Sequence, residues 1–207
     1  SPYKESVAPD IKQTFTRDEY IEVIQALQRH IARGDIYEIN FCQEFYVKNA
    51  EIDPLMVFIA LNNLSPTPFA NYFKINNLFI ISATPERFLS RRGNKLISQP
   101  IKGTSSRNTD AKRDEMQKDE LLKNEKERAE NVMIVDLVRN DLTKSAKPGT
   151  VRVEELFGIY SFKKVHQMIS TVVCEADEKL SNTGIIANTF PMGSMNGAPK
   201  IKAMQLA

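Results

Sequence analysis

Two turn sequences in the middle of the chain constrain its fold most strongly. Asn76-Asn77 and Arg92-Gly93-Asn94 each separate two β-rich segments, and turns of this kind join antiparallel neighbours. Elsewhere, helical and strand-like segments come in blocks, whereas in a doubly wound sheet they alternate strictly. The sequence therefore predicts an α+β fold, a layered sandwich of largely antiparallel sheets flanked by helices.

Three segments have the patterns of helices. Thr16 and Glu19 form a capping box, apolar residues follow at helical spacing, and Gly34 supplies the stop. Asp53-Pro54 predicts the start of a second, short helix, because Asp caps well and Pro suits the first turn. Residues from about 110 to 142 form one or two long helices, charged at first and apolar later.

Further strands are expected before and after these helices. Residues 35–45 alternate apolar and polar side chains, which predicts a strand, and 151–157 and 160–173 are strand-like again. A glycine-bearing loop, 191–199, then leads into a helix that begins at Lys200.

Charge and hydropathy exclude several classes of protein. The 207 residues include 28 basic and 26 acidic side chains, and this balance argues against a bulk electrostatic binder of nucleic acid. No apolar run approaches the roughly 18–20 residues needed to span a bilayer. Residues 1–6 lack the basic-then-apolar pattern of a leader. We therefore expect a cytoplasmic protein that binds neither nucleic acid nor membrane.

Glu130 is the first candidate for chemistry. On the predicted helix its neighbours three, four and seven residues on are the apolar Met133, Ile134 and Leu137. A carboxylate on a buried stripe is costly unless a cation pairs with it, so a buried ion pair is one interpretation. The other is a metal ligand, with Glu127 one turn earlier as a second carboxylate. Mg²⁺ uses one or two protein carboxylates and takes its other oxygens from water and substrate.

Lys102 is a candidate nucleophile at the end of a predicted strand. It precedes Gly103, and glycine is typical where a backbone approaches a ligand closely. A lysine there is ordinarily a surface residue, but a desolvated lysine has a lowered pKa and becomes a nucleophilic amine. Glu86 is either its acid partner or a solvated turn residue.

His166 and the loop before Lys200 allow two interpretations each. Strand alternation puts His166 on the face of Met168 and Ser170, as a hydrogen-bonded core residue or an active-site donor. The loop does not match a P-loop, because the spacing from Gly193 to Lys200 is wrong. It is either a plain glycine turn or a helix N-terminus that holds a carboxylate or phosphate.

Five stretches of the chain resemble motifs of the chorismate-utilising enzymes and occur in that family's order. The family includes the anthranilate, aminodeoxychorismate, isochorismate and salicylate synthases. Five ordered motifs that span nearly the whole chain are far more specific than any single one. The matching stretches are 34–40, 83–89, 100–104, 126–142 and 190–204.

Residue 102 indicates which branch of the family the chain resembles. Pro-Ile-Lys-Gly-Thr is typical of aminodeoxychorismate synthases, whereas anthranilate synthases carry alanine in place of this lysine. In the lysine-bearing enzymes the amine adds to C2 of chorismate as the C4 hydroxyl leaves, and ammonia then enters at C4. The resemblance therefore implies that Lys102 is the nucleophile and that Glu86 is the general acid on the departing hydroxyl.

The resemblance also implies a cofactor, partners and further site residues. Glu130 would bind Mg²⁺, with Glu127 beside it. Chorismate and ammonia would be the substrates, with the ammonia delivered by a glutamine amidotransferase subunit. The product, 4-amino-4-deoxychorismate, is the precursor of 4-aminobenzoate and folate. The implied substrate-binding residues are Glu38, Gly103, Thr104, His166, Ser194, Gly197 and Lys200.

The chain departs from the family pattern in two ways. Glu38 stands where aminating enzymes usually carry glutamine and isochorismate-type enzymes carry a lysine base. The chain also lacks the family's amino-terminal region and its carboxy-terminal segment, which supplies another metal-binding glutamate. We therefore expect residues 1–207 to be a partial catalytic domain that is inactive by itself. Two other functions stay open: anthranilate synthase component I, and a catalytically silent domain that binds chorismate or docks an amidotransferase.

Overall fold

The computed structural model describes residues 10–207, so residues 1–6, on which the expectation about a leader rests, lie outside the described part. In chain order the elements are β1 (Lys12–Gln13), α1 (Arg17–Arg33), β2 (Glu38–Ile39), β3 (Phe45–Tyr46), α2 (Pro54–Leu64), β4 (Asn71–Ile75), β5 (Leu78–Ser82), β6 (Arg87–Arg92), β7 (Lys95–Gln99), β8 (Ile101–Ser106), α3 (Ala111–Lys123), α4 (Glu125–Thr143), β9 (Arg152–Ser161), β10 (Val165–Glu175), α5 (Asn182–Thr189), the 3-10 turn η1 (Gly193–Met195), β11 (Gly197–Ala198) and α6 (Lys200–Leu206).

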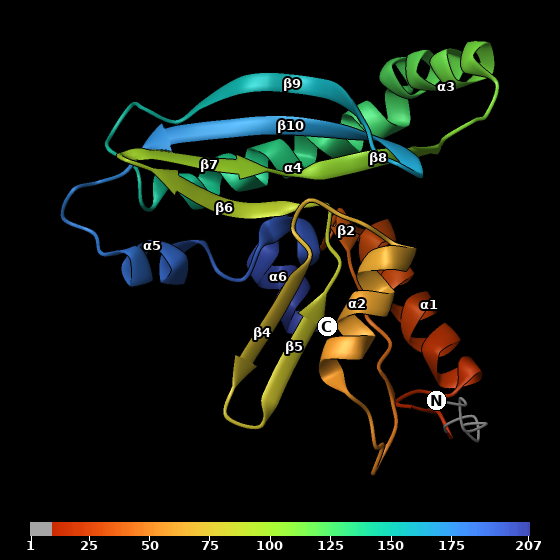
Figure 1. The fold of residues 1–207 in the computed structure, drawn as a ribbon. Helices are drawn as coiled ribbons and strands as arrows, with labels where there is room; N and C mark the ends of the chain where they lie inside the picture. Colours follow the sequence, from red (N-terminus) through yellow and green to blue (C-terminus); the bar gives the residue numbers. More distant parts are fainter. Residues whose placement is uncertain (1–9) are drawn as a thin grey trace.

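The main sheet is antiparallel and is organised around β10 (Figure 1). β7 and β8 follow one another along one edge of β10, β9 lies along the other edge, and β6 extends the sheet beyond β7. The predicted α+β fold with largely antiparallel sheets is confirmed. Both predicted turns are confirmed too, since they join β4 to β5 and β6 to β7.

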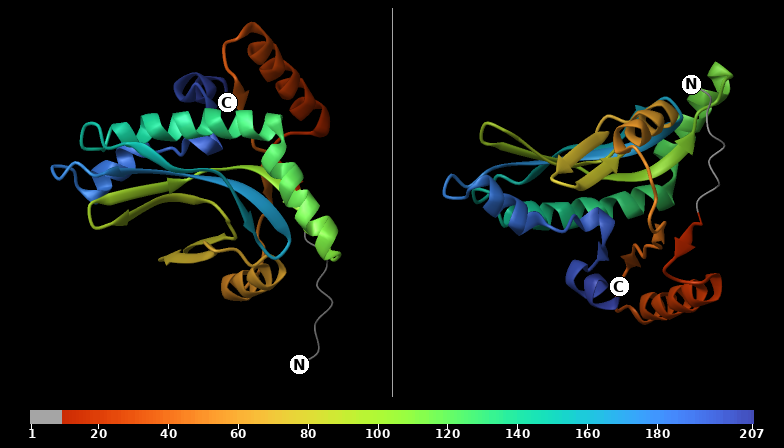
Figure 2. Two further views of the ribbon diagram at one scale, coloured as in Figure 1. Left: turned by 90° about the horizontal axis from the view of Figure 1, so that it is seen from above. Right: turned by 60° about the horizontal axis from the view of Figure 1, so that its bottom comes forward.

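Helix α4 covers one face of this sheet and forms the core with it (Figure 2). Val172 and Cys174 of β10 pack against Ile134, Val138 and Leu142 of α4. Alternate side chains of β10 point toward the helices. His166, Met168 and Ser170 therefore share one face, as predicted, and that face packs against the helices. The polar members of this face find partners there: Ser170 Oγ donates to Asn131 of α4, and His166 bonds Asp114 of α3.

The β4–β5 hairpin, α1, α2 and α6 lie below the sheet in Figure 1. The left view of Figure 2 separates them: the hairpin and α2 lie on the side of the sheet opposite α4, whereas α1 and α6 lie on the α4 side. Two-residue pairings of β1 with β3 and of β2 with β11 fasten the amino-terminal segment. Across residues 10–207, none of the helices has the length and apolar character that a membrane crossing would need.

Two strand predictions are wrong in extent. The segment 35–45 is not one strand, because β2 has only Gly197 and Ala198 to pair with. Its alternation has another cause: Phe41 packs against Tyr20 of α1, with ring centroids 5.5 Å apart. We expected residues 158 and 159 to separate two strands, but they are paired with β10 and belong to β9, next to an irregularity in the register. The turn between β9 and β10 comes at 162–164.

Candidate active site

Gly103 sets the approach of β8 to its neighbours. Its φ is +97°, and a Cβ there would lie 3.2 Å from the Cβ of Met168 and 3.3 Å from that of Glu127. Both the left-handed backbone and the crowding select glycine. The preceding carbonyl, that of Lys102, accepts a hydrogen bond from Asn131 Nδ2 at 3.4 Å. The backbone of β8 at Lys102 and Gly103 therefore runs close to α4.

The amine of Lys102 lies beside Glu38. Its Nζ is 3.5 Å from Glu38 Oε1, and the two side chains are only 22% and 17% exposed. Glu38 is held by the β2–β11 pairing, in which the Tyr37 N–H donates to the Ala198 carbonyl at 2.7 Å. Gly197 of β11 lies opposite Ile39, and a Cβ on Gly197 would overlap the Glu38 carbonyl oxygen. The structure thus brings Glu38, Lys102 and Gly197 together, as predicted for one site.

Glu86 joins the same group of residues from the segment between β5 and β6. Its Oε1 accepts a hydrogen bond from Ser194 Oγ at 2.7 Å and one from the Ile101 N–H at 3.4 Å. Burial raises the pKa of Glu86, and the Ser194 hydroxyl, the Ile101 N–H and the charge of Lys102 offset part of that rise. Glu86 therefore keeps its proton to a higher pH than an ordinary carboxyl does, which suits a general acid.

Glu130 is not on the buried stripe, so that expectation is wrong. Its side chain is 31% exposed and pairs with Lys126, itself exposed, at 3.5 Å. The buried stripe of α4 runs instead through Asn131, Ile134 and Val138, which puts Glu130 at its edge. Glu127, one turn earlier, lies against Gly103, with its Oε2 3.3 Å from the position of a Cβ there.

The two glutamates fit a divalent cation only as part of a ligand set. Within residues 10–207, no three His, Cys, Asp or Glu side chains come together as a metal site would need. Mg²⁺ requires few protein carboxylates and completes its shell with water and substrate oxygens. Glu127 and Glu130 are residues of that kind, one turn apart on α4, and Glu127 lies beside β8 at Gly103.

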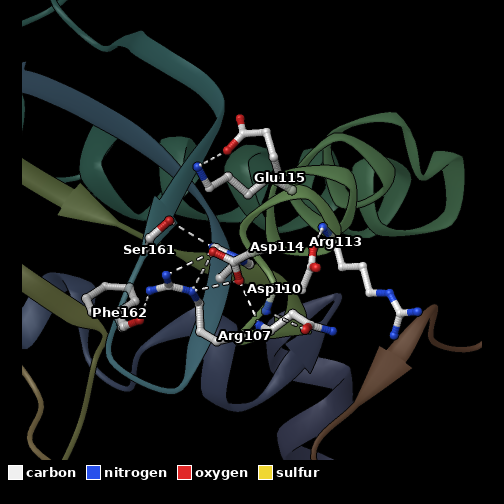
Figure 3. Close-up of polar contacts among 10 residues, drawn as sticks. Arg107, Asp110, Arg113, Asp114, Glu115, Ser161 and Phe162 are labelled. Carbon is white, nitrogen blue, oxygen red and sulfur yellow. Dashed lines mark hydrogen bonds and ion pairs between the residues drawn. The ribbon is translucent and has the colours of Figure 1, made fainter.

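His166 does not lie free in the site, and the predicted substrate contact is not what the structure shows. Its ring is fully buried, with Nε2 2.9 Å from Asp114 Oδ1 and Nδ1 2.8 Å from Ser161 Oγ. Figure 3 shows Asp114 between Arg107 and Ser161. Because a carboxylate only accepts, Nε2 donates to Asp114, and the Ser161 hydroxyl forms the hydrogen bond at the other ring nitrogen. Arg107 completes the network, since its Nη2 lies 2.9 Å from Asp114 Oδ2. The hydrogen-bonded core interpretation of His166 is the one observed.

Asp114 is the centre of this network, and replacing it by asparagine should lower Tm at pH 7. Hydrogen bonds from Arg107, the Asn108 N–H and His166 hold the pKa of Asp114 well below its usual range. A depressed carboxyl pKa contributes stability above the unfolded-state value of about 3.9, and this contribution is lost as pH falls further. The loss of Tm should therefore shrink in acid. Thermal unfolding of Asp114→Asn against Asp119→Asn, an exposed change on the same helix, tests this, and equal Tm losses would contradict it.

Lys200, the other predicted substrate residue with a cationic side chain, is held by partners within the fold. Its Nζ lies 2.8 Å from Asp141 Oδ2 and donates to the Thr189 carbonyl at 3.0 Å, and the Lys200 side chain is 11% exposed. A buried cation needs such partners, and here they come from α4 and α5. Thr104 is exposed at its position in β8. Ser194 is the residue of the carboxy-terminal loop whose side chain contacts Glu86 directly.

Sequence reasoning missed two asparagines that position the site. Asn131 bonds both the Lys102 carbonyl and the Ser170 hydroxyl. Asn40 Nδ2 donates to the Ser194 carbonyl at 3.0 Å, which ties β2 to the turn η1. A polar residue on the buried stripe of α4 was an available signal for Asn131, because buried amides require partners. No signal in the sequence pointed to Asn40.

Comparison with known proteins identifies relatives of the whole chain. The family described as chorismate binding enzyme matches residues 1–207. Aminodeoxychorismate synthase component 1 of Escherichia coli (strain K12) is 35% identical over 201 residues, which are 97% of this chain and 44% of that protein. Anthranilate synthase alpha subunit 2, chloroplastic, of Oryza sativa subsp. japonica is 38% identical over 195 residues, which are 94% of this chain and 32% of that protein.

A solved structure has the same fold. Anthranilate synthase component I from Streptococcus pneumoniae TIGR4 superposes with a TM-score of 0.83 at 26% identity, over 96% of this chain and 44% of that one. The chain spans less than half the length of these relatives.

Proposed function

The chain belongs to the chorismate-binding enzyme family, and on that premise we propose that the full-length protein aminates chorismate at C4 to give 4-amino-4-deoxychorismate. One observation supports this reaction above all others. The Lys102 amine lies 3.5 Å from the largely buried Glu38 carboxylate. Burial raises the pKa of Glu86, and the charge of Lys102 offsets part of that rise. A sheltered amine beside a carboxyl that favours its proton supplies both a nucleophile and an acid for the leaving group.

The proposed reaction uses these two residues in turn. The uncharged Lys102 amine forms a bond to C2 while the C4–O bond breaks, and protonated Glu86 gives its proton so that the hydroxyl leaves as water. Ammonia then forms a bond to C4 while the C2–N bond breaks, and the electron pair returns to Lys102. Splitting the substitution into two steps is the ordinary gain of covalent catalysis.

Other residues of the site hold the substrate in this proposal. The substrate would contact the Ser194 hydroxyl, the backbone at Gly103, Thr104 and Gly197, and the Glu38 carboxylate. Glu127 and Glu130 would hold Mg²⁺, which when bound screens the negative charge of a substrate carboxylate. The ammonia would come from a glutamine amidotransferase subunit.

Product identification tests the proposal. The full-length protein is incubated with chorismate, ammonia and Mg²⁺, and we expect 4-amino-4-deoxychorismate with no pyruvate. A matched reaction with a chelator in excess over Mg²⁺ should slow turnover, since the carboxylates of α4 would then lack their cation. No turnover of chorismate in the complete protein would contradict the proposal.

Anthranilate synthesis is the second candidate, because the Oryza sativa anthranilate synthase subunit is 38% identical to this chain. Overall identity does not separate the two reactions, since the relatives of both kinds have similar values. The same incubation separates them: anthranilate with release of pyruvate would support this second candidate.

A further inference from the structure

We propose that Asn131 of α4 and Ser170 of β10 form a clamp that holds the backbone at Lys102 in the position from which its amine reacts. The inference rests on the proposed function, in which Lys102 is the nucleophile, and assigns two positioning residues to it. In this role neither side chain touches the substrate. The clamp acts through the peptide group between Lys102 and Gly103, whose carbonyl oxygen accepts a hydrogen bond from Asn131.

A β-bulge carries Lys102. Between two regular pairs of the β8–β10 ladder, two residues of β8, Lys102 and Gly103, stand opposite one residue of β10, Met168. A bulge of this kind bends its strand and re-aims a side chain. Gly103 permits the bulge with its φ of +97°, but glycine adopts many other conformations as readily. The bulge therefore needs a hold from outside β8 if Lys102 is to keep one position.

The strand on the other edge of β10 has a bulge beside Ser170. Leu156 and Phe157 of β9 together stand opposite this serine. Phe157 has a φ of +62°, a costly conformation for a bulky residue, which persists only where its surroundings enforce it. Its N–H donates to Ser170 Oγ at 3.1 Å, and the guanidinium of Arg128 lies 4.7 Å from the centre of its ring. Ser170 thus has a fixed partner on β9.

Asn131 links the two bulges. Ser170 Oγ accepts the N–H of Phe157 and gives its own hydrogen to Asn131 Oδ1. Asn131 Nδ2 in turn donates to the Lys102 carbonyl at 3.4 Å. The two ends of this chain each have one polarity, because a backbone N–H only donates and a carbonyl only accepts. Turning the amide over would put its oxygen against the Lys102 carbonyl, so one orientation of Asn131 satisfies every group.

The clamp is buried and attached to the core. The side chain of Ser170 is 0% exposed and that of Asn131 is 1% exposed. A buried polar network with every member paired is rigid, because a member left without its partner costs free energy. Asn131 belongs to α4, whose Ile134 and Val138 lie in the hydrophobic core. The Lys102 carbonyl is therefore tied to a helix that the core itself holds in place.

Single-turnover kinetics of the full-length protein test the clamp. With saturating chorismate and no ammonia, mass spectrometry gives the rate constant for adduct formation at Lys102 and the fraction of molecules that react. Asn131→Ala should lower the rate constant about 10²-fold, the effect of a misplacement of about 1 Å, and leave the reacting fraction near that of wild type. Ser170→Ala leaves the amide in place and should lower the rate constant about tenfold. Poor folding alone would lower the fraction and spare the rate constant.

Matched changes separate positioning from stability. Ser98→Ala removes a buried hydroxyl of β7 that donates to the Phe88 carbonyl, so it should lower Tm as Ser170→Ala does but keep the wild-type rate constant. Asn140→Ala, at an exposed position of α4, should change neither quantity. Combining Asn131→Ala with Ser170→Ala should give the rate constant of Asn131→Ala alone, because Ser170 acts through Asn131.

Hydrogen exchange tests the clamp without the reaction. Peptides that cover residues 101–106 should exchange faster in both clamp variants than in Ser98→Ala, because the bulge has lost its hold. Unchanged exchange there, or a wild-type rate constant in Asn131→Ala, would overturn the inference. If Asn131→Ala does not fold, equal rate constants in Ser170→Ala and Ser98→Ala would overturn it instead. A wild-type protein that forms no adduct, while exchange rises as expected in the variants, would overturn the proposed function and leave the clamp as the hold on the bulge.

Discussion

Lys102→Ala in the full-length protein should reduce formation of 4-amino-4-deoxychorismate by roughly 10⁴-fold and abolish the covalent adduct, because alanine lacks the amine that the proposed reaction uses as its nucleophile. The side chain is 22% exposed and its Nζ faces Glu38, so alanine removes both the nucleophile and the counter-charge of a largely buried carboxylate. Steady-state rates and intact mass after incubation with chorismate measure the two effects separately.

Two further variants separate the nucleophile from the charge. Lys102→Arg keeps a cation beside Glu38 but has no nucleophilic amine, so it should lose the adduct while retaining more of the wild-type stability than alanine does. Lys74→Ala removes an exposed lysine of the β4–β5 hairpin and should leave turnover unchanged. An adduct that forms at another residue, or turnover that persists in Lys102→Arg, would refute the covalent role.

The sequence predicted those elements whose signals are local. The capping box of α1 is present, with Glu19 Oε2 accepting from the Thr16 N–H at 2.8 Å and the Glu19 N–H donating to Thr16 Oγ at 3.3 Å. Asp53 caps α2 as expected. Such bonds join residues within one turn, so the residue types alone specify them. The strand expected over 35–45 depends on a partner more than 150 residues away, and β11 provides only two residues of it.

The same distinction applies to the site. Glu38, Glu86, Lys102 and Ser194 come together because β2, the loop after β5, β8 and η1 meet there, and the family motifs pointed to all four. His166 and Lys200 carried equally suggestive chemistry, but Asp114 and Asp141 engage them. Whether a cation or an imidazole is free depends on the carboxylate that folding brings beside it. A single sequence does not show that pairing.

Glu86→Gln should lower turnover about 10³-fold, because glutamine cannot protonate the leaving hydroxyl. The substitution should not weaken the fold. The side-chain carbonyl of glutamine can still accept the bonds now made by Ser194 Oγ and the Ile101 N–H. Burial raises the pKa of Glu86, so the folded state binds this proton more tightly than the unfolded chain does, and the wild type loses stability as pH rises through that pKa. The Tm of the variant relative to wild type should therefore rise from acid to neutral pH. In the wild type, turnover should fall over that same rise in pH, because the acid loses its proton.

Measuring turnover and thermal unfolding across one pH series checks both halves of this expectation. Glu44→Gln is the matched control, since that carboxylate is exposed and bonds only the Thr14 side chain among the residues of the described region. A structural role for Glu86 predicts that stability and turnover fall together in the variant. An acid role predicts that they separate, with Tm held or raised at neutral pH while the rate collapses. If Glu86→Gln kept wild-type turnover, the departing hydroxyl would have to receive its proton from another group.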